Sequence, residues 1–98
     1  MPLPLEVKQW VDSNIRTRMT TYDFADPNEQ NIKNAWLCED PLEFLHGMIV
    51  GEILGDAYRT AAMLLERVPT DEENQEIYSM VEAQKIEIKD MITNAKNV

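Results

Sequence analysis

The sequence predicts an all-α protein, and three observations support this: helix start signals, helical periodicity and the lack of strand patterns. Start signals occur at Asp26-Pro27, Asp40-Pro41 and Thr70, each with an acidic residue three positions later. An Asp or Thr side chain can accept hydrogen bonds from the unpaired N–H groups of a first helical turn, where proline has no N–H to lose. Apolar residues recur at three- and four-residue steps, and no stretch alternates as a half-buried strand does.

The first predicted helix covers residues 5–22. It has one apolar stripe at helical spacing, made of Trp10, Val11, Ile15, Met19 and Tyr22. Residues 23–39 are predicted to form a connector with a short helix after Asp26-Pro27, in which Ile32, Ala35 and Trp36 form a small patch.

Two longer helices, 41–68 and 71–96, are predicted to form an antiparallel hairpin onto which the N-terminal helix packs. The second of them has a heptad-like seam, made of Ile77, Val81, Gln84, Ile88, Met91 and Ala95. Residues 1–98 are predicted to form a single domain, because a chain of this length builds one core.

Three glycines, Gly47, Gly51 and Gly55, lie four residues apart inside the helix 41–68. Each costs about 1 kcal/mol relative to alanine in a helix interior, so a compensating contact is expected. At about 100° per residue, Tyr58 and Ala62 continue the same side. This side could meet a second copy in a two-fold dimeric bundle, or helix 5–22 or 71–96 could cover it within the chain. We expect the dimer.

His46 follows Glu43 by three positions, so the two side chains share one helix face. This spacing occurs in the carboxylate-bridged metal sites of helical bundles, where Glu39, Glu52 or Asp56 could complete the ligand set. The interpretation we prefer is that Glu43 completes the capping motif after Asp40 and that His46 is an exposed first-turn residue. A helical wheel at about 100° per residue also predicts that the apolar face of helix 41–68 changes sides near residue 50. Leu45 and Ile49 lie on the side that becomes polar beyond this point.

Other catalytic chemistries lack their residues. One histidine and one cysteine, Cys38, exclude a cysteine zinc site and disfavour a serine triad. No phosphate-binding glycine motif is present, so no cofactor is expected, and a non-catalytic role is preferred over an enzyme.

The net charge of −9 is concentrated between residues 19 and 84, where 14 acidic and three basic side chains leave −11. Acidic proteins bind nucleic acid and anionic membranes poorly, because binding to either surface depends on Lys and Arg side chains that neutralise phosphate charges. We therefore expect a small cytoplasmic interaction or regulatory protein that acts as a homodimer on a protein partner with a basic surface, for example as an inhibitor of a nucleic-acid-binding protein. Seven acids stand at helix starts, which reduces the charge available to a partner: Asp26, Glu29, Asp40, Glu43, Asp71, Glu72 and Glu73.

Overall fold

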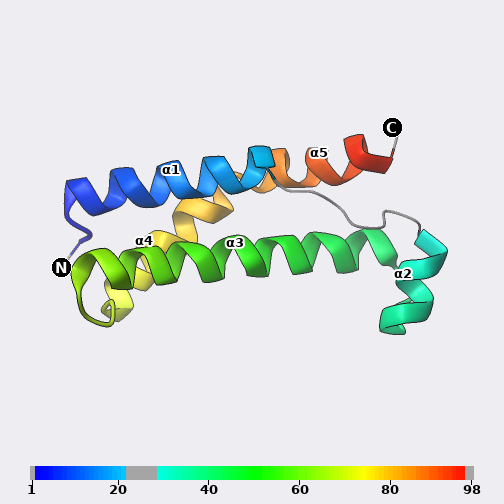
Figure 1. The fold of residues 1–98 in the computed structure, drawn as a ribbon, viewed down its shortest axis with the longest axis horizontal. Coiled ribbons are helices and arrows are strands. Elements are labelled where there is room, and N and C mark those ends of the chain that lie inside the picture. The colour runs from blue at the N-terminus through cyan, green and yellow to red at the C-terminus, as the bar shows by residue number, and fades with distance from the viewer. Residues whose placement is uncertain (1, 22–28, 97–98) are drawn as a thin grey trace.

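The computed structural model describes residues 2–21 and 29–96, and these residues form five helices and no strand (Figure 1). The prediction of an all-α fold is confirmed. The helices are α1 (Leu5–Thr21), α2 (Glu29–Trp36), α3 (Pro41–Leu65), α4 (Asp71–Glu82) and α5 (Lys85–Lys96). Tyr22 and the start signal at Asp26-Pro27 lie outside the described residues.

Helix α3 lies at the centre of the fold, and each of the other four helices packs against it. In Figure 1, α1 runs along α3 in the opposite direction, and α4 crosses behind α3 toward α5. Helix α2 packs near the start of α3, where the Trp36 ring stacks on Phe44 with centroids 6.1 Å apart. Ile32 of α2 is buried, whereas Trp36 remains 64% exposed.

The predicted capping signals set the starts of α3 and α4. The Asp40 carboxylate accepts the backbone N–H of Glu43 at 3.1 Å, and Pro41 occupies the first turn. Thr70 and Glu73 form a reciprocal capping box at α4. Helix α3 ends earlier than the predicted residue 68, because Glu66 adopts a left-handed conformation with φ of 56° and closes the last turn.

The core is built on ridges of residues spaced by four. On α3 the ridge consists of Pro41, Leu45, Ile49, Ile53, Ala57 and Ala61, all buried. Each four-residue step turns the ridge by about 40° around the helix, so the buried face winds continuously along α3. The change of apolar face that was predicted near residue 50 is therefore a gradual rotation along the whole of α3.

Ridges with the same spacing face α3 from the other helices, and they consist of Val7, Val11 and Ile15 on α1, Ile77 and Val81 on α4, and Ile88 and Ile92 on α5. Ridges of this kind interdigitate when helices cross obliquely, as α4 and α3 do in Figure 1. Trp10 falls off the α1 ridge and is 59% exposed, so its predicted place in the buried stripe is wrong.

The predicted single helix over residues 71–96 is two helices, interrupted at Ala83 and Gln84. The N–H of Gln84 donates to the carbonyl of Val81 at 2.9 Å, three residues back, which is a tighter turn than an α-helix makes. We call residues 83–84 the α4–α5 joint. No proline or glycine lies at the joint to impose the interruption.

Candidate functional site

The three glycines lie on the outer side of α3 and touch no other helix. Gly47 and Gly51 are exposed, and Gly55 is half-buried. A Cβ atom added at any of the three would meet no side chain or neighbouring backbone within 4 Å. None of them has a positive φ, so the backbone does not require glycine either. Among the described residues, no part of α1, α4 or α5 therefore lies within 4 Å of the Cβ positions of these three glycines.

The other residues predicted to pack with the glycines lie on the same side of α3. Tyr58 and Ala62 continue beyond Gly55, and both line a shallow hollow together with Arg59, Val68, Pro69 and Asn74 of α4. Val68 is 82% exposed in this hollow. We call the surface made by Gly47, Gly51, Gly55, Tyr58 and Ala62 the glycine face.

The side chains of Glu43 and His46 have different neighbours in the structure. The backbone N–H of Glu43 bonds to the Asp40 cap, and its carboxylate lies 3.6 Å from Lys89 Nζ of α5. The residues that the structure describes contain no group of three or more Asp, Glu, His or Cys side chains that could hold a metal ion. Only half of the capping motif predicted for Asp40 and Glu43 is present: Asp40 accepts the Glu43 N–H, but the Glu43 carboxylate lies beside Lys89. His46 is half-buried rather than exposed.

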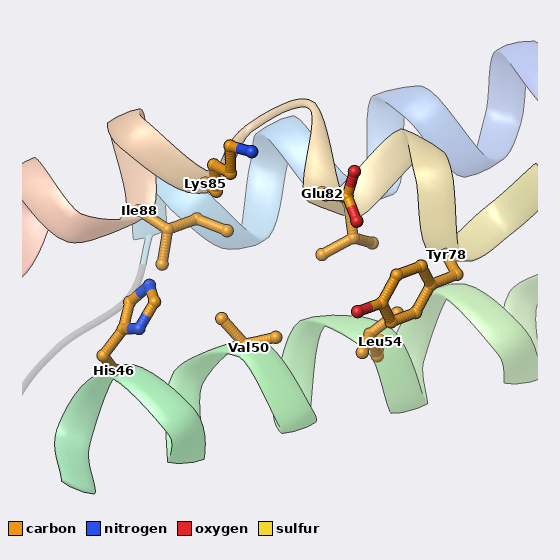
Figure 2. Close-up of a pocket in the computed structure, with 8 residues that line it drawn as sticks. His46, Val50, Leu54, Tyr78, Glu82, Lys85 and Ile88 are labelled. Atoms are coloured by element: carbon orange, nitrogen blue, oxygen red, sulfur yellow. The ribbon is translucent and has the colours of Figure 1, made fainter. Parts of the chain in front are cut away.

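His46 instead lines a pocket of about 340 Å³ between α3 and the α4–α5 joint. Figure 2 shows the side chains around this pocket: His46, Val50 and Leu54 from α3, Tyr78, Val81 and Glu82 from α4, and Lys85 and Ile88 from α5. The ring of His46 points toward Ile88. Its Nε2 atom is buried and has no hydrogen-bond partner among the described residues. Nothing in the sequence indicates this pocket, because residues from two sides of the joint form it.

Much of the acidity of residues 19–84 is compensated locally. Arg18 of α1 lies 2.6 Å from Asp56 and 3.9 Å from Glu52, and Arg59 also pairs with Asp56. Acidic side chains of this segment that take part in ion pairs with other described residues include Glu43, Glu52, Asp56, Glu73 and Glu76. Because Lys8, Arg18 and Lys89 come from outside residues 19–84, the surface of this segment is less acidic than its own charge of −11 indicates.

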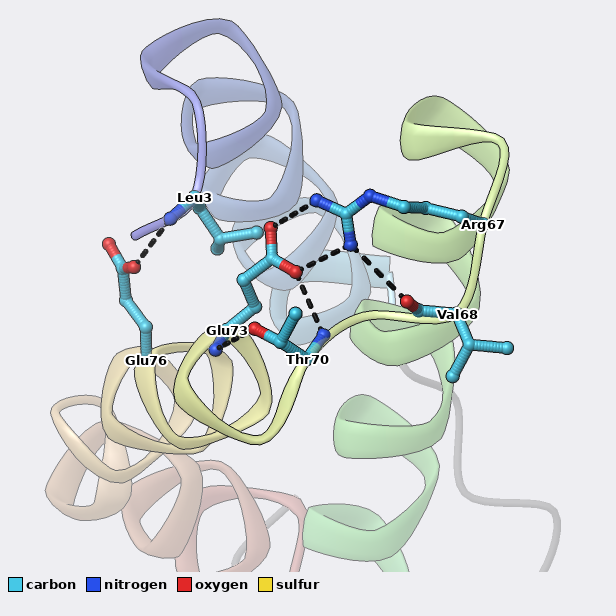
Figure 3. A network of polar contacts seen from close by, with 6 residues as sticks. All are labelled: Leu3, Arg67, Val68, Thr70, Glu73 and Glu76. Carbon is cyan, nitrogen blue, oxygen red and sulfur yellow. Dashed lines mark hydrogen bonds and ion pairs between the residues drawn. The ribbon is translucent and has the colours of Figure 1, made fainter. Parts of the chain in front are cut away.

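A bidentate pair joins Arg67 to Glu73 at the turn between α3 and α4 (Figure 3). Two guanidinium nitrogens of Arg67 donate to the two carboxylate oxygens at 2.7 and 3.0 Å. Glu73 is fully buried and also accepts the N–H of Thr70. Arg67 and the Thr70 N–H lower the pKa of Glu73 from 4.5 to about 2, although burial alone would raise it.

A second contact ties the N-terminus to α4. The backbone N–H of Leu3 donates to Glu76 at 2.9 Å, and Lys8 Nζ lies 3.1 Å from the same carboxylate. The hydrogen bond from Leu3, helped by Lys8, lowers the pKa of Glu76. The sequence predicted the capping role of Glu73. It did not predict that Glu73 pairs with Arg67, or that Glu76 binds Leu3 and Lys8.

No family model matches this chain, and the comparisons with curated proteins and with solved structures gave no match either. Within the described residues, no helix is both long enough and apolar enough to cross a membrane.

Proposed function

We propose that the chain is a non-catalytic interaction protein that acts as a homodimer, through the glycine face, on a protein partner with a basic surface. The observation that supports the homodimer is the open surroundings of the three glycines. Three helix-interior glycines cost about 3 kcal/mol together relative to alanine. Since none of the described residues fills the space of the missing Cβ atoms, we infer that these glycines serve a contact with another molecule.

The face suits a second copy because its features are arranged about Gly51. Gly47 and Gly55 lie four residues to either side of Gly51, and the aromatic residues Phe44 and Tyr58 lie seven residues to either side. In an antiparallel pair of α3 helices with the two-fold axis at Gly51, Phe44 comes level with Tyr58 of the second copy. The glycines let the two backbones approach closely, as small residues do where helices cross.

The dimer is tested by sedimentation velocity on the wild-type chain, on Gly51→Leu and on the control Ser13→Leu. We expect a wild-type mass of twice 11.3 kDa, the same for Ser13→Leu, and the single-chain mass for Gly51→Leu. The control adds similar apolar bulk at an exposed position of α1. A monomeric wild type, or a dimeric Gly51→Leu, would refute the glycine face as the interface.

The basic partner is the second part of the proposal. Acidic side chains without an ion pair among the described residues lie at both ends of α3, where Glu39 precedes it and Glu66 and Asp71 follow it. Attraction through exposed charges weakens as salt rises, because the Debye length falls from about 10 Å at 0.1 M to about 3 Å at 1 M. We expect partner binding to be lost over this range and in the variant Glu66→Lys/Asp71→Lys. Binding that persists in high salt and in this variant would contradict an electrostatic partner.

A further inference from the structure

We propose that the pocket at the α4–α5 joint binds a small, uncharged, mostly apolar ligand that carries one hydrogen-bonding group. This site is separate from the glycine face, and the inference does not depend on the homodimer. Its volume of about 340 Å³ lies at the lower end of the range for small-molecule sites, which is about 300–1,000 Å³.

The walls of the pocket are apolar and come from three helices. Val50 and Leu54 project from α3, Val81 and the Tyr78 ring from α4, and Ile88 from α5 (Figure 2). Val81 and Ile88 are buried in the closed state that the structure shows, whereas Tyr78 is 51% exposed at the edge of the pocket. An apolar ligand body would gain its binding free energy by removing these surfaces from water.

The mouth of the pocket has no net charge. Glu82 and Lys85 stand on either side of the joint with opposite signs, and neither forms an ion pair with the described residues. A charged ligand would therefore be attracted by one of these side chains and repelled by the other. This balance favours a ligand without a formal charge.

His46 supplies the polar group that faces the ligand. A neutral imidazole offers one donor and one acceptor nitrogen, and buried nitrogens in folded proteins are almost always paired. Nε2 of His46 is buried without a partner among the described residues. A hydroxyl, amine or carbonyl of the ligand would satisfy it.

The joint gives the ligand access to that nitrogen. The His46 ring points toward Ile88, which lies in the first turn of α5 beyond the joint. The joint contains a tight turn from Gln84 to Val81 in place of regular α-helical bonding, and such interruptions act as hinges. A small outward rotation of α5 about the joint would move Ile88 away from His46 and expose Nε2 to the pocket.

The test uses N-phenyl-1-naphthylamine, an uncharged fluorescent probe with one N–H group, and compares it with its sulfonated anionic analogue, 1-anilinonaphthalene-8-sulfonate. We expect saturable binding of one uncharged probe per chain, with clearly weaker binding of the anionic analogue. Val50→Trp fills the pocket and should abolish binding, while His46→Phe removes the hydrogen bond and should weaken it about tenfold. Met63→Trp places the same bulk at an exposed α3 position outside the pocket and should bind like the wild type.

Folding of every variant is checked by circular dichroism. Tyr78→Ala removes an exposed wall residue, so it tests the pocket even if Val50→Trp fails to fold, and it should also weaken binding. Wild-type affinity in Tyr78→Ala and in Val50→Trp would place the probe elsewhere and overturn the site. Equal binding of the two probes would overturn an uncharged ligand. The measurement is repeated in Gly51→Leu, where retained binding is expected whether or not the homodimer forms.

Discussion

Replacing all three helix-interior glycines with alanine, in the variant Gly47→Ala/Gly51→Ala/Gly55→Ala, should stabilise the isolated chain. The added methyl groups meet no atom within 4 Å of their Cβ positions, and none of the three residues has a positive φ. Alanine in a helix interior is favoured over glycine by about 0.5–1 kcal/mol, mainly because glycine loses more backbone entropy on folding. The triple variant should therefore gain about 1.5–3 kcal/mol in free energy of unfolding.

A gain of this size is easily measured. For a domain of up to about 100 residues, 1 kcal/mol shifts the melting temperature by about 4–8 °C, so we expect a rise of about 6–24 °C. The assay is thermal and urea unfolding followed by circular dichroism, at concentrations where sedimentation shows a monomer. The control Ala62→Gly removes a Cβ atom from the same face and should lower the free energy of unfolding by about 1 kcal/mol.

The same substitutions should weaken the proposed dimer, because three methyl groups on each helix keep the two backbones apart. Stability and self-association thus change in opposite directions. A less stable triple variant would mean that the glycines serve a contact inside the chain and would refute the reasoning. A more stable variant with unchanged self-association would show that the glycines are not part of the dimer interface.

Four further outcomes follow from the packing and the electrostatics. Ile53→Ala, at a fully buried position of the α3 ridge, should lower the free energy of unfolding by about 2–5 kcal/mol in urea denaturation. Glu66→Gly should raise it by about 0.5–1 kcal/mol, because glycine adopts the left-handed conformation at the end of α3 without steric cost. His46→Leu should raise it by about 1 kcal/mol, since it removes an unpaired buried nitrogen, and a loss of stability would show that Nε2 has a partner. The pKa of Glu73 is about 2 when folded and 4.5 ordinarily, so its stabilising contribution is complete above pH 4.5 and is lost as the pH falls toward 2. Glu73→Gln should therefore lower stability at neutral pH and flatten acid unfolding between those values, and an unchanged acid limb would contradict the ion pair.

The starts of α3 and α4 could be predicted because local chemistry determines them. Asp40 and Thr70 bond to backbone N–H groups within their own first turns, so a few neighbouring residues contain the whole signal. The end of α3 was predicted less well, because Glu66 stops the helix in a left-handed conformation that glycine or asparagine usually adopts.

The buried faces were harder to predict, since they depend on the angle at which helices cross. Average helical periodicity placed Trp10 in the stripe of α1, but the ridges spaced by four select Val7, Val11 and Ile15. Likewise, nothing near Gln84 in the sequence marks the joint. The pocket beside the joint therefore cannot be predicted from the sequence, because its lining residues come from three helices.

The glycine stripe could be located from the sequence, whereas its surroundings could not. Residue spacing put Gly47, Gly51 and Gly55 on one side of α3, but only the packing of α1, α4 and α5 shows that this side is uncovered. The partner of Glu73 was missed for a related reason. Arg67 lies beyond the end of α3, where helical spacing no longer indicates which side chains meet.

Helix α3 contacts all four other helices, and this arrangement determines which parts of the fold can open independently. Helices α2 and α5 each pack mainly on α3, so either can detach while α1, α3 and α4 stay assembled. Amide hydrogens of α2 and α5 should exchange through such partial openings, whereas those near Ile49 and Ile53 of α3 should exchange only on global unfolding. Slowest exchange along α3 would identify this helix as the last structure to be lost, and therefore as the element on which the cooperativity of folding depends.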